Sequence, residues 1–197
     1  GNLDAVIAAV QNGADAVYMG FGDGFNARRS ADNFTRESFA KAVRYCHIRG
    51  CKVYVTLNTL VGDREMDAAA ALAQQASDAG ADAILVQDLG LARVLRAALP
   101  DIPLHASTQM SIHNLAGVEA AAEMGITRAV LARELSLEQI RFISQHASIE
   151  TEVFVHGALC FCYSGQCYMS ALIGRRSGNR GACAQPCRMQ YSMGGRM

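Results

Sequence analysis

The sequence predicts an α/β protein whose βα units repeat and curl into a (β/α)8, TIM-barrel-like fold. The first observation is a glycine that ends an Ala-rich amphipathic helix and is followed by a short apolar run, which is how a helix feeds a buried parallel strand. This pattern recurs in residues 12–20, 79–88 and 124–131, with a variant in 49–57. Residues 103–106 and 151–155 supply two further strand-like runs without the glycine.

The second observation is that helical periodicity separates these runs. The expected helices cover about 3–12, 35–48, 64–79, 91–99, 114–124 and 136–145. Two of them have N-cap residues, because Thr35 stands three residues before Ser38 and Ser136 precedes Leu137-Glu138-Gln139.

The third observation is even spacing, since six strands alternate with six helices at intervals of roughly 20 to 37 residues. A doubly wound sheet fits this alternation too, but the evenness and the polar strand ends favour the barrel. We expect residues 1–157 to form the barrel and residues 158–197 to form a Cys- and Arg-rich segment packed at its mouth.

Composition excludes several classes of protein. The chain has 197 residues with 51% hydrophobic content, which is enough for a sizeable core. Polar residues or glycine interrupt every apolar stretch within about ten residues, too short for a transmembrane helix. The first residues lack the basic region of a signal peptide, so we expect a reducing cytoplasm and regard disulfides as the weaker interpretation of the cysteines.

The zero net charge hides an asymmetry. All 18 acidic residues lie at or before Glu152, whereas residues 153–197 contain five arginines: Arg175, Arg176, Arg180, Arg188 and Arg196. Such a basic segment favours an anionic partner, either RNA phosphate or a carboxylate metabolite. The competing interpretation is that the arginines form ion pairs with the acidic body.

Active sites of such barrels lie at the carboxyl ends of the strands, where this chain places several polar residues. The candidates for substrate binding there are Tyr18, Asn58 and Gln109, although a capping role competes for Asn58 and for nearby Ser107. Arg133 beside Glu134 suits carboxylate binding or acid–base chemistry. The Gly-rich stretch 20–29, with Arg28, could cradle an anion.

Five of the seven cysteines fall within 28 residues: Cys160, Cys162, Cys167, Cys183 and Cys187. Cysteines brought together by irregular, Gly-rich chain are typical of a thiolate-bound metal or an iron–sulfur centre.

The run 152–170 around the first three of these cysteines resembles the signature of peptidase family U32. The matching elements are Glu152, Phe154, the run Gly157-Ala158-Leu159-Cys160, and Gly165-x-Cys167-x-Met169-Ser170. Further resemblance lies in residues 1–4, 13–18, 25–28, 131–136 and 180–188, so it extends over nearly the whole chain.

The resemblance implies a barrel-type catalytic domain, historically labelled a protease or collagenase. Several members are understood as oxygen-independent hydroxylation proteins acting on tRNA, ribosomal RNA or ubiquinone precursors. They carry a [4Fe–4S] cluster, and the tRNA branch is associated with prephenate as an anionic partner.

The resemblance assigns cluster ligation to Cys160, Cys167 and Cys183, with Cys187 as a conditional fourth ligand, because some relatives draw a ligand from further downstream. Cys162 falls in a variable position and has the competing interpretation of a small buried hydrophobe. Relatives also have a strand before the segment that opens this chain, so we expect an incomplete barrel with a strand missing at each end and poor stability or cluster loading.

Three functions compete at this point. The first is a redox hydroxylase in which Arg133, Glu134 and His156 act at the barrel mouth and Arg28 and Arg180 help to bind an anionic or RNA-borne substrate. The second is a peptidase with Cys160 or Cys162 as nucleophile and His156 as base, although the chain has no His-Glu-x-x-His or Gly-x-Ser-x-Gly motif. The third is an RNA-binding module stabilised by a zinc site of four cysteines.

Overall fold

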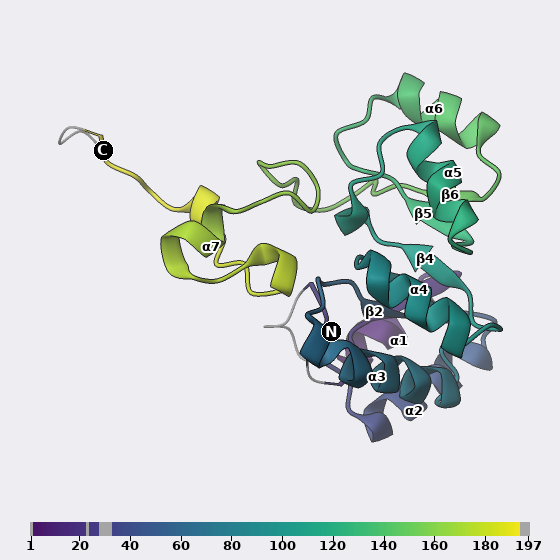
Figure 1. Ribbon diagram of the computed structural model, residues 1–197. Helices are drawn as coiled ribbons and strands as arrows, with labels where there is room; N and C mark the ends of the chain where they lie inside the picture. The colour runs from purple at the N-terminus through teal and green to yellow at the C-terminus, as the bar shows by residue number, and fades with distance from the viewer. Residues whose placement is uncertain (1, 23, 28–32, 194–197) are drawn as a thin grey trace.

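The fold is a single curled parallel sheet with helices on its outside, in a computed structural model that describes residues 2–22, 24–27 and 33–193. The sheet has six strands in the order β1-β2-β3-β4-β5-β6, and every neighbouring pair is parallel. The strands are β1 Ala16–Met19, β2 Lys52–Leu57, β3 Ala83–Val86, β4 Leu104–Ala106, β5 Arg128–Val130 and β6 Glu150–Glu152. The fold is therefore an open, incomplete (β/α)8 barrel (Figure 1).

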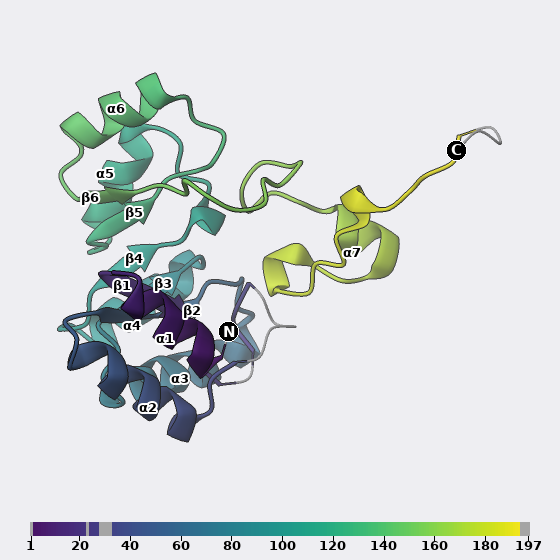
Figure 2. The same ribbon diagram turned by 180° about the vertical axis from the view of Figure 1, so that it is seen from behind.

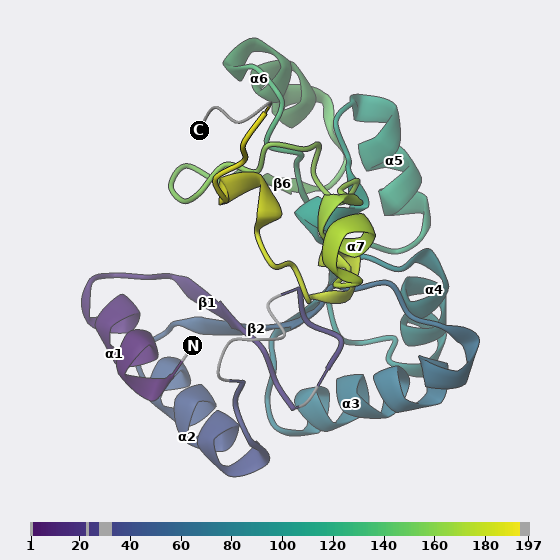
Figure 3. The same ribbon diagram turned by 90° about the vertical axis from the view of Figure 1, so that its left-hand side faces the viewer.

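The strand order decides between the two architectures that the sequence allowed. In a doubly wound sheet the order reverses at a switch point, and helices cover both faces. Here each strand pairs with the next along the chain, and the helices that alternate with the strands lie around the outside of the curled sheet (Figure 3). The prediction of a barrel is confirmed.

Six helices agree with the sequence-based ranges to within a few residues, and one further short helix, at 169–174, was not predicted. The helices are α1 Leu3–Gln11, α2 Arg36–His47, α3 Met66–Asp78, α4 Leu89–Ala98, α5 Leu115–Glu123, α6 Leu137–His146 and α7 Met169–Gly174, with 3-10 turns η1 Asp63–Glu65, η2 Thr108–Met110, η3 Gly178–Arg180 and η4 Pro186–Arg188. Thr35 caps α2 by accepting the Ser38 N–H at 3.3 Å, and Ser136 and Gln139 form a capping box on α6.

The buried apolar side chains form two clusters, one on each face of the sheet. In β2, Val53, Val55 and Leu57 belong to the large cluster between sheet and helices, whereas Tyr54 belongs to a smaller cluster with Ala83, Leu85 and Val130. Successive side chains of a strand point to opposite faces, so this smaller cluster lies on the inner face.

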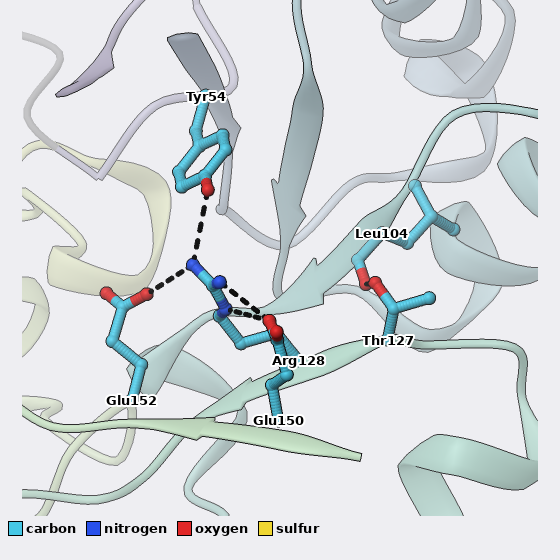
Figure 4. A network of polar contacts seen from close by, with 6 residues as sticks. All are labelled: Tyr54, Leu104, Thr127, Arg128, Glu150 and Glu152. Atoms are coloured by element: carbon cyan, nitrogen blue, oxygen red, sulfur yellow. Dashed lines mark hydrogen bonds and ion pairs between the residues drawn. The ribbon is translucent and has the colours of Figure 1, made fainter. Parts of the chain in front are cut away.

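A charged network also lies on the inner face (Figure 4). The Arg128 guanidinium donates to Glu150 at 2.6 Å and 2.9 Å, to Glu152 at 3.3 Å and to the Tyr54 hydroxyl at 3.4 Å. Burial, with nearby Arg128, lowers the pKa of His105 to about 4, so this histidine is neutral at physiological pH.

The last strand differs from the expected run 151–155, because β6 ends at Glu152. Val153, Phe154 and Val155 are 37%, 46% and 93% exposed. β6 is the edge of the sheet and pairs only with β5 in the described part of the chain, so no neighbouring strand covers these apolar side chains.

The chain after β6 leaves the sheet on the side of the strands' carboxyl ends and carries α7 beyond them (Figures 1 and 2). Within the described residues, none of the helices has the length and apolar character that crossing a membrane requires.

Candidate functional site

Polar side chains at the carboxyl ends of β2 and β4 form hydrogen bonds with one another. The Asn58 amide donates to Ser107 Oγ at 3.1 Å, and Asn58 Oδ1 accepts the Ala27 N–H at 2.9 Å. Ser107 Oγ also accepts the Gln109 N–H at 3.3 Å, as the cap of η2. These contacts hold the loops in place, and a role in substrate binding for Asn58 and Gln109 stays a prediction.

Arg133 and Glu134, which follow β5, form hydrogen bonds with the Cys- and Arg-rich segment 158–197, called the cysteine segment below. Both the N–H and the hydroxyl of Ser164 donate to Glu134 Oε1, at 3.0 Å and 3.1 Å. Arg133 Nε donates to Ser164 Oγ at 3.3 Å, and its guanidinium reaches the Ala158 carbonyl at 3.5 Å. Ser164 is 1% exposed, so the turn between Cys162 and Cys167 is fixed to the end of β5.

Gly165, the next residue, packs against η2. Its φ of +72° lies in the left-handed region, and a Cβ on it would stand 2.0 Å from the Gln109 carbonyl oxygen. Only glycine allows this approach of backbone to backbone. The Ser164-Gly165 turn therefore docks onto the ends of both β4 and β5, a role that sequence reasoning missed although both residues lie inside the recognised signature.

A second group of contacts joins Arg180, in the same Cys- and Arg-rich segment, to the loop after β2. The Arg180 guanidinium binds Glu65 at 2.6 Å and 2.7 Å and donates to the Leu60 carbonyl at 2.7 Å, while the Leu60 N–H donates to the Asn179 carbonyl at 3.1 Å. The hydrogen bonds from Arg180, together with one from the Gly62 N–H, lower the pKa of Glu65 to about 2. Arg180 thus forms an ion pair with the acidic body, which is one of the two interpretations of the tail arginines that the sequence left open, and its predicted role in substrate binding stays a prediction.

The other predicted site residues lie apart from these anchors. Tyr18 is 54% exposed on the edge strand β1. His156 is exposed, and within the described chain no hydrogen bond joins it to Cys160 or Cys162. Arg28 lies outside the described residues.

The five clustered cysteines are free thiols at or near the surface. Cys160, Cys183 and Cys187 are exposed, and Cys162 and Cys167 are half-buried. Burial raises the pKa of the Cys162 thiol, and the neighbouring Cys167 thiol adds to the increase. The Cys183 sulfur accepts the Gln185 N–H at 3.3 Å.

Thiolates are the right donors for iron or zinc. Across the ranges that the structure describes, however, no three metal-binding side chains are gathered in a ligating arrangement. The donor chemistry of the predicted set Cys160, Cys167, Cys183 and Cys187 fits such a centre, and its assignment stays a prediction.

The two remaining cysteines belong to the core. Cys46 and Cys51 are buried where α2 turns into β2, and burial, with the neighbouring Cys51, raises the pKa of Cys46 to about 11. A thiol with so high a pKa is a poor ligand and a poor nucleophile at neutral pH.

Known proteins resemble this chain over almost all of its length. It is 46% identical to the 23S rRNA 5-hydroxycytidine C2501 synthase of Escherichia coli, over 96% of this chain and 29% of that protein. It is 39% identical to tRNA hydroxylation protein P1 of Bacillus subtilis, over 98% of this chain and 46% of the relative. It is 36% identical to a collagenase of Porphyromonas gingivalis, over 98% and 49%. The chain thus spans half or less of the length of these relatives.

The fold has a solved counterpart in a U32 peptidase, with a TM-score of 0.62 and 19% identity over 76% of this chain and 63% of that structure. The model of peptidase family U32 matches residues 1–196. This match, together with the open six-stranded barrel, shows that the chain belongs to peptidase family U32.

Proposed function

We propose that this chain is the barrel part of an enzyme that hydroxylates a base in RNA. The observation that carries the proposal is the 46% identity, over 96% of the chain, to a protein named as an rRNA hydroxycytidine synthase. The identity to a tRNA hydroxylation protein supports RNA as the substrate class. The segment free of acidic residues supports a polyanionic substrate at the barrel mouth.

A [4Fe–4S] cluster held by Cys160, Cys167, Cys183 and Cys187 would supply one-electron transfer without molecular oxygen when bound. The chain's own residues position the segment. Glu134 and Arg133 fix the turn between Cys160 and Cys167, and Glu65 fixes Arg180 three residues before Cys183. The predicted anionic partner, prephenate in the family resemblance, would need a cation that is not already paired in this way.

The test measures the metal and the product separately. Protein purified without oxygen is analysed for visible absorption and for iron, sulfide and zinc, in the native form and as Cys167→Ser, with Cys51→Ser as a matched control in the core. We expect iron and sulfide in the native protein and in the control, and their loss in the variant. A colourless protein with one zinc would support the zinc-stabilised RNA-binding module instead.

The product is read as nucleosides. Digests of tRNA and rRNA from cells with and without the gene are compared by mass spectrometry for nucleosides heavier by one oxygen atom. Loss of one such nucleoside on deletion, restored by the native gene and not by Cys167→Ser, supports the proposal. An unchanged nucleoside profile contradicts it.

The peptidase function rests on the name of the collagenase relative. Cleavage of gelatin by purified native protein, abolished in Cys160→Ala or Cys162→Ala, would favour it over hydroxylation.

A further inference from the structure

The cysteine segment carries large aromatic rings that the protein does not bury. Phe161, Tyr163, Tyr168 and Tyr191 are 91%, 70%, 65% and 58% exposed. Single exposed rings are ordinary, but four along one short segment leave a large apolar area in water without internal benefit. Their exposure indicates a surface that meets a partner.

The charge around these rings is positive and not neutralised. The segment has no acidic residue, and only Arg180 of its described arginines is paired with a carboxylate. Arg176 Nε donates to the Ala182 carbonyl at 3.1 Å, and the Arg188 guanidinium reaches the Leu159 carbonyl at 3.4 Å. These contacts orient the two guanidinium groups and leave their full charge available to an anion.

The chain that carries the rings is anchored at two points. Tyr163 directly precedes Ser164, whose buried side chain is bound by Glu134, and Gly165 is packed on η2. The Arg180–Glu65 pair holds the other end of the segment. A platform fixed at two points loses little further conformational entropy when a ligand binds.

We propose that Phe161, Tyr163 and Tyr168 form a stacking platform for unpaired bases of RNA, with Arg176 and Arg188 binding the adjoining phosphates. Aromatic rings and arginines together in one segment are the composition that binds single strands, because an unpaired base exposes its face and a paired base does not. A polyanion complements the positive charge of the segment, whereas an ordinary protein surface of mixed charge does not. The identity of the partner as RNA rests on the proposed function, whereas the preference for unpaired bases goes beyond it.

The experiment measures binding of fluorescein-labelled oligocytidine of about 12 nucleotides to the 197-residue chain by anisotropy, beside a duplex of the same length. We expect tighter binding of the single strand. Loss of one ring in Phe161→Ala or Tyr163→Ala should weaken binding about fivefold or more, and Tyr163→Phe should retain it. The matched controls are Phe142→Ala and Leu137→Ala, exposed apolar residues of α6 that should have no effect.

Salt dependence separates rings from charges. Arg176→Ala or Arg188→Ala should reduce the slope of log K against log salt by about one, while the ring variants weaken binding with the slope unchanged. Circular dichroism and metal analysis of each variant establish that fold and metal content are those of the native chain.

Equal binding of duplex and single strand, or ring variants that bind like the controls, would overturn the platform. So would ring variants that change self-association measured by light scattering and leave RNA binding intact, because the surface would then be a protein contact. The proposed hydroxylation is judged by the nucleoside profile, so it can stand when the platform fails.

Discussion

Gly165→Ala tests whether the cysteine turn depends on its close contact with η2. Gly165 has φ +72°, and an added Cβ would lie 2.0 Å from the carbonyl oxygen and 2.8 Å from the carbonyl carbon of Gln109. Both atoms are backbone, so the turn must move. The left-handed conformation costs a residue with a Cβ about 1 kcal/mol, and overpacking adds about 1–3 kcal/mol.

The control is Gly50→Ala, since Gly50 has φ +71° with no atom within 4 Å of its added Cβ. The two substitutions share the backbone strain and differ in the clash. The expected difference of about 2 kcal/mol in docking free energy corresponds to roughly a 30-fold loss of protection against amide hydrogen exchange in the cysteine segment, including the Ser164 N–H.

Hydrogen exchange read by mass spectrometry of peptides measures this effect. Gly165→Ala should deprotect the cysteine segment and leave the strands unaffected, whereas Gly50→Ala should act only near the turn between α2 and β2. The reasoning is refuted if both variants leave the protection of the cysteine segment equal to that of the native chain.

Three further substitutions test the anchors and the inner face. Glu134→Ala should release the cysteine segment in the same exchange assay, because it leaves the buried Ser164 N–H and hydroxyl without an acceptor, and Glu134→Gln should preserve much of the docking. The depressed pKa of Glu65, about 2 against an ordinary 4.5, means that its ion pair with Arg180 stabilises tail docking above pH 4.5 and is lost as pH falls toward 2. Exchange of the tail should therefore rise on acidification in the native chain and depend less on pH in Arg180→Ala; equal pH dependence would contradict this. The pKa of His105 is lowered from 6.5 to about 4 in the folded protein. Between these two values the unfolded chain binds a proton that the folded chain does not, so the free energy of unfolding falls as the pH is lowered from 6.5 toward 4. Urea unfolding should show about 2 kcal/mol less stability near pH 5 than at neutral pH, with a smaller loss in His105→Phe, and an unchanged pH dependence in that variant would refute the assignment.

The sequence was informative where structure is local or repeated. Apolar periodicity and caps such as Thr35 and Ser136 located all six outer helices, because caps and periodicity depend on neighbouring residues. The glycine that precedes four of the apolar runs predicted buried parallel strands, and the even spacing of all six runs favoured the barrel, in which strands pair in chain order. Strand β6 was predicted too long, since an apolar run does not reveal whether a neighbouring strand exists to cover it.

The sequence was less informative about which polar groups meet. Arg180 and Glu65 are 115 positions apart, and Ser164 and Glu134 are 30 apart. Such pairs follow from how the tail folds back over the strand ends, which no local pattern encodes. Arg133, Glu134 and Arg180 were therefore predicted as functional from their chemistry alone, and the structure gives each of them a contact that holds the segment.

These anchors make the cysteine segment dependent on the integrity of the barrel. Its contacts come from the loops after β2, β4 and β5, through Glu65, Gln109 and Glu134. The three loops keep their relative positions only while β2 to β5 remain paired in register. Cys162 and Cys167 flank the turn fixed at β4 and β5, whereas Cys183 follows the anchor at β2. Any centre that uses cysteines from both groups therefore requires the strands between them to be paired, so metal loading and folding of this half of the barrel should be lost together.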